Sequence, residues 1–343
     1  MSAGGSRLTS ATALPEDSKH TQDWQLFAST SCQSCSVTTD AAAVLSQVSS
    51  SPTALHNMAT VAGSRGASAF GSFATGKALR GACRAGAFAG PTAGQAPGHV
   101  QANLVILPGR YAEQFSDFCA QNSAPCPLLE ATAVGSYEPT RLAPGADLRT
   151  DLPKYHVWRE GEMVEERTEV LDLWRDDMQG FLLGCSFTWE DLLAEAQLMP
   201  RHIQEQRNVP MFNTSIKLRS SGPFQGNMVV SMRPYRPEDA AGPVSDITGR
   251  YLAAHGPPVH IGEPAEIGVK DLSKPDYGEA VSLRAGEVPV FWACGVTPQN
   301  ALRNARLPLV ITHAPGHMFV GDVRNDELLS WPVPGSWNAR PTE

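Results

Sequence analysis

Two histidines, His313 and His317, lie four residues apart in LVITHAPGHMFVGDV, residues 309–323. On a helix this spacing would place both imidazoles on one face, where they could bind a metal ion. Pro315 and Gly316 stand between them, however, and this pair predicts the end of an apolar strand followed by a sharp loop. The two histidines are therefore candidates for acid–base chemistry at a strand end. The alternative is that each ring only bonds a neighbouring carbonyl.

A second candidate site lies in VPVFWACGVTPQNAL, residues 288–302. We expect a strand, Val288–Cys294, to run through Gly295 into a helix. Thr297 is the expected cap of this helix, and Pro298 occupies its first position. Because backbone N–H groups at a helix N-terminus bind anions, Gly295 to Thr297 form a candidate anion-binding cradle.

The charge of the chain limits the kinds of partner it can bind. A formal net charge of −8 and the lack of a basic run argue against a nucleic-acid-binding or acidic-membrane-binding surface. No apolar run approaches the ~20 residues of a membrane span. An anionic small molecule would instead need individual arginines. Arg207 in RNVPM and Arg233 in SMRP lie beside proline-restricted backbone and are the best candidates, with a structural ion pair as the alternative for each.

The seven cysteines are an odd number, and most lie in apolar patterns typical of buried thiols. A reducing compartment fits this usage. Cys32 and Cys35 have C-x-x-C spacing but no preceding strand and no second pair, which does not favour a metal or redox role. Cys294 ends an expected strand, where a helix N-terminus could lower its pKa, and we interpret it as a packing residue.

Two further polar segments could contribute to a site. ADLRTDLP contains Asp147, Arg149 and Asp151, and such alternating charges usually satisfy one another within a loop. Gln101 and Asn103 follow a loop rich in Gly and Pro, and one of them is expected to bond a ligand.

The elements that position these residues follow an N-terminal segment of simple composition. Residues 1–70 are rich in Ser, Ala, Thr and Gly without a sustained period, so we expect a disordered extension. Beyond it, hydrophobic periodicity predicts the following elements: strand Leu104–Leu107 and a helix after it, a hairpin turning at Glu160–Gly161, helices over Leu171–Leu183, Trp189–Leu198 and Pro237–Ala254, and strand Val288–Cys294 with its helix.

These elements predict a layered α/β fold. Residues 71–135 and 225–343 are expected to form the main α/β domain, and residues 136–224 an inserted α+β subdomain that covers its mouth. Parallel neighbouring strands would bring the cradle at Gly295 and the two histidines to one sheet edge.

The chain also contains nine distinctive segments in this order: GPTAGQAPGHVQANLVILP, PCPLLE, ADLRTDLPKY, FLLGCSFTWEDLL, RHIQEQRNVPMFNT, MVVSMRP, HGPPVHIGEP, VPVFWACGVTPQNAL and ITHAPGHMFV. Together they resemble the D-glutamate cyclase family over roughly residues 75 to 330. The resemblance implies closure of D-glutamate to 5-oxo-D-proline with loss of water, in a mitochondrial or bacterial cytosolic setting. It also implies a three-layer α/β domain with a mixed sheet and a smaller two-layer α+β subdomain.

For that reaction the ammonium group must lose protons and the departing oxygen must gain them. His313 and His317 are the expected acid–base pair, with His260 in reserve. Arg207 and Arg233 are the expected clamps for the two carboxylates of the substrate.

The remaining expected roles concern the oxyanion and the amine. Backbone N–H groups from Gly295 to Thr297, assisted by Asn208, are expected to bind the oxyanion. Asn103 is an expected substrate ligand, and Asp151 could receive the ammonium proton instead of a histidine.

Three hypotheses for the function remain open. The first is a lyase that acts on a small amino acid without a metal or other cofactor. The second is a metal-dependent hydratase or hydrolase using His313, His317 and Asp322, and the third is a binding protein without turnover. The expected partner is a small amino-acid substrate, with no nucleic acid or membrane, and a homo-oligomer is compatible with the sequence. The expected compartment is the cytoplasm, or the mitochondrial matrix if residues 1–70 are a transit peptide.

Overall fold

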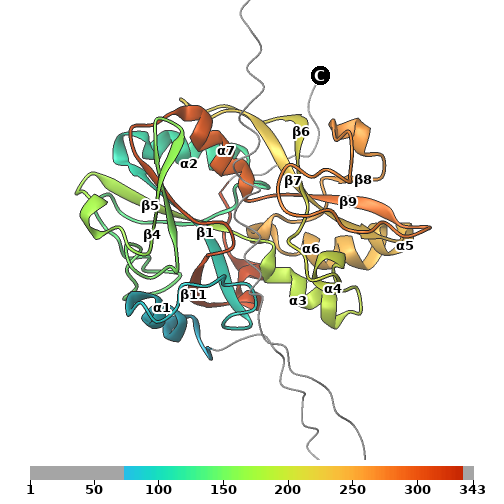
Figure 1. Cartoon of the computed structure of the whole chain (residues 1–343), viewed down its shortest axis with the longest axis horizontal. Coiled ribbons are helices and arrows are strands. Elements are labelled where there is room, and N and C mark those ends of the chain that lie inside the picture. Colours follow the sequence, from blue (N-terminus) through green and yellow to red (C-terminus); the bar gives the residue numbers. More distant parts are fainter. Residues whose placement is uncertain (1–72, 335–343) are drawn as a thin grey trace, which may run out of the picture. The chain divides into compact units, whose positions relative to one another are not determined.

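The computed structural model describes residues 73–334, which belong to one compact unit, Arg65–Glu343. The expected extension at residues 1–70 lies outside the described residues, as do Cys32 and Cys35. Two sheets organise the described part of the chain (Figure 1).

The larger sheet has seven strands in the order β2-β5-β1-β10-β3-β4, with β11 also paired to β1. Strand β1 lies at its centre, where it pairs with β5, β10 and β11. Every residue after His99 in this strand is buried. The strands are β1 (His99–Pro108), β2 (Leu128–Ala131), β3 (Tyr155–Arg159), β4 (Glu162–Arg167), β5 (Met178–Gly184), β10 (Val310–His313) and β11 (Phe319–Arg324).

The smaller sheet has four strands in the order β6-β7-β9-β8. Strand β7 pairs with β9 along its length, from Val230 opposite Ala293 to Tyr235 opposite Val288. The strands are β6 (Met211–Lys217), β7 (Asn227–Tyr235), β8 (His260–Ile261) and β9 (Val288–Ala293).

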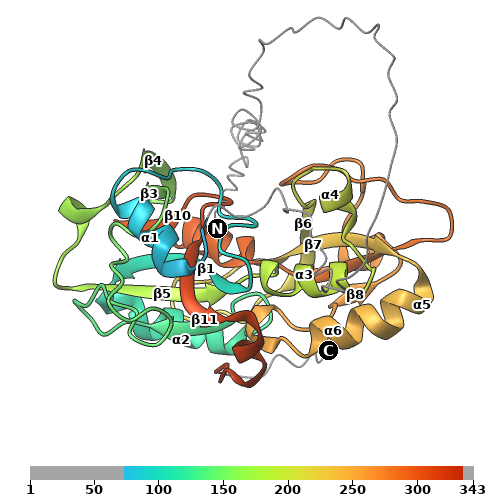
Figure 2. The same ribbon diagram turned by 90° about the horizontal axis from the view of Figure 1, so that it is seen from below.

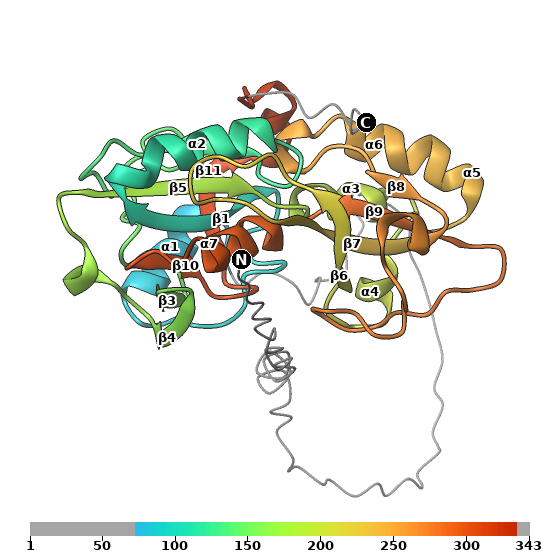
Figure 3. The same cartoon turned by 90° about the horizontal axis from the view of Figure 1, so that it is seen from above.

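Helices cover these sheets on several sides. The α-helices are α1 (Gly76–Arg84), α2 (Ala112–Gln121), α3 (Phe187–Glu195), α4 (Arg201–Gln204), α5 (Pro237–Asp239), α6 (Ser245–Gly249) and α7 (Val296–Ala305). Short 3₁₀ turns span Gly109–Tyr111, Leu171–Leu173, Leu252–Ala254, Pro264–Ile267 and Asn325–Ser330, and a π turn spans Ala240–Val244. In Figure 1, α2 and α7 lie above β1 and β5 and α1 lies below them; Figure 2 shows the molecule from below, and Figure 3 shows it from above. Among the described helices, none has the length and apolar character to cross a membrane.

The structure confirms an α/β fold with a smaller subdomain, but it corrects the strand directions. Every pairing between described strands is antiparallel, so the expected mixed sheet with parallel neighbours is wrong. Strand β1 is apolar along its length because both of its faces are covered, and such a run is also typical of parallel strands. Strands β9 and β10, expected to be neighbours, belong to different sheets.

The sheets also divide the chain at other places than expected. Strands β3, β4 and β5 fall within residues 136–224, yet they pair in the larger sheet with β1 and β10. Strand β9, expected in the main domain, pairs with β7 in the smaller sheet. Pairing between strands that are distant in the sequence therefore decides which residues belong to each sheet.

Two expected helices are also wrong in part. The segment expected as helix Leu171–Leu183 contains a 3₁₀ turn and then strand β5, because a short apolar run fits either structure. The expected helix Pro237–Ala254 is broken, since Gly242 has non-helical dihedral angles and Pro243 follows it. The hairpin at Glu160–Gly161 is confirmed by the pairing of β3 with β4.

One hydrophobic core joins the two sheets. It includes Leu104 of β1, Leu182 of β5, Trp189 of α3 and Trp292 of β9. The rings of Trp189 and Trp292 have centroids 5.5 Å apart. The core therefore holds the turn between β5 and α3 next to the turn between β9 and α7.

Candidate active site

Two strand–helix units cross between the sheets. Strand β5 of the larger sheet leads into α3, and Glu190 of α3 pairs with Arg233 on β7 of the smaller sheet. Strand β9 of the smaller sheet leads into α7, and Gln299 of α7 lies 3.4 Å from the ring of His313 on β10 of the larger sheet. Each helix thus contacts the other sheet as well as the sheet of its own strand.

The two units share a sequence pattern. GCSFTWED, residues 184–191, and ACGVTPQN, residues 293–300, both have cysteine at the second position and threonine at the fifth. The second segment carries amides where the first carries carboxyl groups. Cys185 was absent from the expected site, and this internal repeat is the sequence signal that identifies it.

Asn103 on β1 connects the two units. Its Nδ2 donates at 2.9 Å to the carbonyl of Gly184, the residue before Cys185. Gly295, the residue after Cys294, lies so close that a Cβ atom there would be 2.6 Å from the same Nδ2. Asn103 is 6% exposed, and among the described residues no donor meets its Oδ1. An amide oxygen without a protein donor can accept a hydrogen bond from a bound molecule.

Both thiols of the repeat lie at the start of a helix. Burial raises the pKa of Cys185 to about 12. The N–H of Phe187 opposes this rise, and the charges of Glu190 and Cys294 add to it. Burial raises the pKa of Cys294 to about 11, against N–H groups of its own helix and the charge of Arg233. The two thiols are therefore neutral at pH 7 and close enough for one charge to affect the other.

Arg233 forms a buried ion pair between the units. Its Nε donates to Glu190 at 3.1 Å, and its Nη2 donates to the hydroxyl of Ser186 at 3.2 Å. The guanidinium carbon lies 4.7 Å from the ring centroid of Trp189 and 5.4 Å from that of Trp292. Although burial opposes ionisation, the charge of Arg233 lowers the pKa of Glu190 to about 2. Arg233 therefore anchors the start of α3, as the ion-pair alternative predicted, rather than presenting a free clamp.

His313 lies beside α7, and His317 lies in the loop that follows β10. Nδ1 of His313 is 3.2 Å from the main-chain nitrogen of Leu104, and its Nε2 is 3.4 Å from Nε2 of Gln299. Burial lowers the pKa of His313 to about 4. The ring of His317 bonds the carbonyl of Pro315 at 2.8 Å, and burial lowers its pKa too. The structure thus places His313, Asn103 and Gly295 around one helix N-terminus.

The expected proton acceptor Asp151 has the contacts of a structural ion pair. Its two carboxylate oxygens accept from Arg84 at 2.8 and 2.6 Å, and Arg80 lies 3.8 Å away. Asp322, the third ligand of the metal hypothesis, accepts from Arg80 at 2.9 Å. Within residues 73–334, no three or more potential metal ligands group together.

The other expected residues make hydrogen bonds in which a main-chain group is the donor or the acceptor. Arg207 donates to the carbonyl of Ala280, and the N–H of Asn208 donates to Glu279 at 3.0 Å. The expected oxyanion cradle is also partly occupied. The N–H of Thr297 donates to the carbonyl of Cys294 at 3.0 Å, and the Thr297 hydroxyl accepts from the N–H of Val229 at 2.9 Å.

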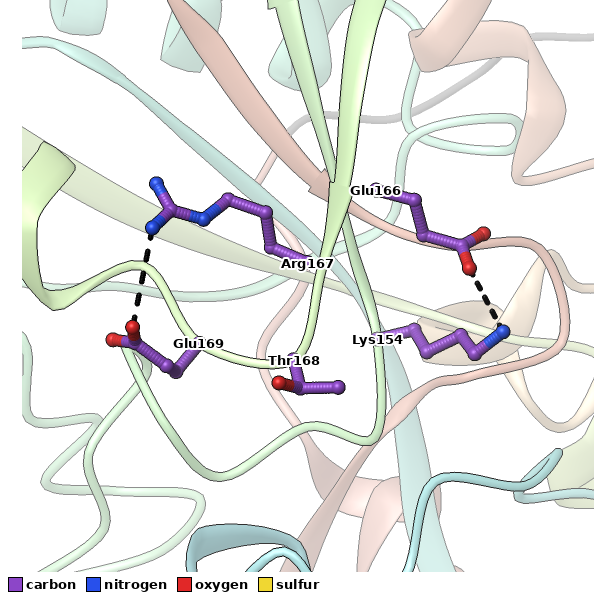
Figure 4. A pocket seen from close by; sticks show the side chains of 5 residues that line it. All are labelled: Lys154, Glu166, Arg167, Thr168 and Glu169. Atoms are coloured by element: carbon purple, nitrogen blue, oxygen red, sulfur yellow. Dashed lines mark hydrogen bonds and ion pairs between the residues drawn. The ribbon is translucent and has the colours of Figure 1, made fainter.

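Two further polar sites form contacts of their own. The reserve residue His260 bonds the carbonyl of Glu263 at 2.8 Å. A surface pocket is lined by Lys154, Glu166, Arg167, Thr168 and Glu169 (Figure 4). Its charges satisfy one another, since Lys154 pairs with Glu166 at 2.8 Å and Arg167 with Glu169 at 4.0 Å.

The fold and the contacts around the starts of α3 and α7 define an α/β protein with buried polar groups between its two sheets. Residues 179–322 match the family model described as D-glutamate cyclase. A protein of Rubrobacter xylanophilus is 58% identical over 71% of this chain and 94% of its own length. Proteins of Geobacillus kaustophilus and Bacillus licheniformis are 54% and 53% identical over 90% and 95% of their lengths, covering 69% and 73% of this chain. All three carry the name "putative hydro-lyase".

The chain belongs to the D-glutamate cyclase family. Sequence identity above 50% over at least 90% of the length of these relatives confirms the resemblance to this family. It also supports a hydro-lyase function.

Proposed function

We propose that the protein closes the ring of D-glutamate to give 5-oxo-D-proline and water. Within this family, the observation that carries the proposal is the unpaired Oδ1 of Asn103, a residue that is 6% exposed and lies beside the start of α7. The ammonium group of an amino acid is a donor that suits this oxygen. The proposed partner is therefore this small molecule.

The reaction needs only one substrate. The amine attacks the side-chain carboxyl carbon of the same molecule, so holding the chain in a bent conformation supplies much of the entropy term. A C–N bond forms and a C–O bond breaks. Two protons leave the nitrogen and both end on the departing oxygen, so the net proton balance is zero.

His313 is the proposed carrier of these protons. Burial keeps its ring neutral at pH 7, so the ring can accept a proton from the ammonium group. Its conjugate acid has a low pKa and readily returns the proton to the leaving oxygen. Its Nε2 lies beside Gln299 in the first turns of α7. Asn103 packs against Gly295 at the start of the same helix.

The first test is product formation. Purified full-length protein is incubated with D-glutamate and separately with L-glutamate, with and without a chelator, and 5-oxoproline is followed by mass and chiral separation. We expect product from D-glutamate only, with and without chelator. A folded sample that makes no product from D-glutamate contradicts the proposal.

A matched pair of histidine variants tests the proton carrier. His313→Gln should lower kcat by at least about 100-fold, the usual contribution of a general acid–base group. His260→Gln should leave kcat unchanged, because His260 bonds only a local carbonyl and the weakly paired Glu266. Equal activity of the two variants would remove His313 from the mechanism.

A further inference from the structure

The repeat places two thiols on either side of one buried amide. Asn103 holds the carbonyl before Cys185 through Nδ2, and the same amide packs against the residue after Cys294. The two units reach this point from different sheets, β5 from the larger and β9 from the smaller. Both thiols are free, and they end equivalent strands at the start of equivalent helices.

This arrangement exceeds what ring closure requires. Cyclisation needs a proton carrier and a place for the oxyanion, but it needs no thiol. A nucleophilic role would require one cysteine and leave the second unexplained. Two proton-transfer groups on opposite sides of a bound molecule are what inversion of a carbon centre needs, because one removes a proton from one face and the other supplies a proton to the opposite face.

The surrounding groups suit an amino acid at this point. The free Oδ1 of Asn103 would hold the ammonium group and so place Cα between the thiols. The buried cation of Arg233 favours the thiolate form of Cys294, whereas at Cys185 the charge of Glu190 opposes the charge of Arg233. Because Arg233 and Glu190 are buried, water screens their charges only weakly.

We propose that Cys185 and Cys294 form a two-thiol acid–base pair that exchanges the Cα proton of the bound amino acid and interconverts its enantiomers. This further activity rests on the proposed function, since it uses the same bound glutamate or its lactam. The cycle begins when one thiol releases its proton to solvent. The resulting thiolate takes the Cα proton, and the C–H electron pair delocalises into the adjacent carboxyl group.

The opposite thiol then donates its proton to the other face of the planar carbon. A new C–H bond forms with inverted configuration, and the second cysteine becomes the thiolate. Exchange with solvent restores the starting state. No oxidant, reductant or second substrate is consumed.

The experiment is incubation of the full-length protein in D₂O with D-glutamate and, separately, with 5-oxo-D-proline. Mass spectrometry measures deuterium at Cα, and chiral chromatography measures the opposite enantiomer. We expect a gain of one mass unit at Cα together with the L-enantiomer. Samples without protein give the background rate.

Cysteine variants separate a catalytic from a structural role. Cys185→Ala and Cys294→Ala should each slow inversion at least about 100-fold, and Cys185→Ser and Cys294→Ser should give the same loss in folded samples. Cys83→Ala, at a buried thiol in a separate cluster with Leu79 and Ala96, should leave inversion unchanged. With D-glutamate, only the variant that keeps the thiol facing the Cα proton should still exchange this proton with retention of configuration. The other variant should do the same with L-glutamate, and a merely structural role does not produce this split.

Two results overturn the inference. One is 5-oxoproline formation by the wild-type protein without Cα deuterium or inversion, which removes the thiol pair and leaves the proposed function standing. The other is unchanged inversion in both folded alanine variants. Deuterium exchange without any 5-oxoproline supports the thiol pair and counts against the proposed function, so the two failures are distinguishable.

Discussion

At the scale of single residues, burial decides the protonation state of two histidines. His313 lies between β1 and α7, and His255 bonds the carbonyl of Ala124 at 2.7 Å. Burial lowers the pKa of each to about 4 from 6.5. The sequence indicated that His313 could do acid–base chemistry, but its pKa depends on neighbours that come from distant segments.

This burial predicts a loss of stability in mild acid. Between pH 6.5 and about pH 4 the unfolded chain binds more protons than the folded one, so stability is full above pH 6.5 and falls as the pH drops. At pH 5 each histidine should lower the free energy of unfolding by about 2 kcal/mol relative to pH 7. Urea unfolding of wild type, His313→Gln and His255→Gln at both pH values measures this. A variant whose pH dependence equals that of the wild type would contradict the assignment for that residue.

At the scale of elements, the site depends on the close approach of α7 to β1. A Cβ atom at Gly295 would lie 2.6 Å from Asn103, so only glycine allows the turn from β9 into α7 to pack there. The sequence pattern of strand, glycine and helix identified this turn. It did not identify Asn103 as the group that meets it, because that contact joins segments almost two hundred residues apart.

Matched glycine variants test this contact. Gly295→Ala should displace Asn103 and destabilise the protein by about 1–3 kcal/mol, with loss of 5-oxoproline formation. Gly81→Ala should stabilise the protein by about 0.5–1 kcal/mol, because Gly81 lies inside α1 with open space around it. Thermal and urea unfolding of both variants provide the comparison. Equal stability changes would show that the close approach is not tight.

At the scale of the whole described unit, the two sheets share one core and should unfold together. Leu104 and Trp292 belong to the same buried cluster although they lie in different sheets. A continuous core of this kind couples the halves, because neither can expose its inner face without exposing that of the other.

Equilibrium unfolding of the full-length chain tests this coupling. Tryptophan fluorescence and far-UV circular dichroism should follow one coincident transition in urea. Leu104→Ala should move both curves together and lower the free energy of unfolding by about 3 kcal/mol. Leu283→Ala, at an exposed position, should change it by less than about 0.5 kcal/mol. Two separated transitions would show that the sheets unfold independently.

The sequence by itself determined the family, the local elements with strong signals, and the chemical types in the site. The ordered segments, the hairpin at Glu160–Gly161 and the strand–glycine–helix turn at Gly295 all depend on local residue patterns that distant contacts do not alter. Only the tertiary structure decided which strands pair, that Arg233 and Asp151 are held in ion pairs, and that the residues next to Cys185 and Cys294 both meet Asn103. The physical reason is that pairing direction, burial and pKa are set by groups far apart in the chain, which meet only when the two sheets close on their common core.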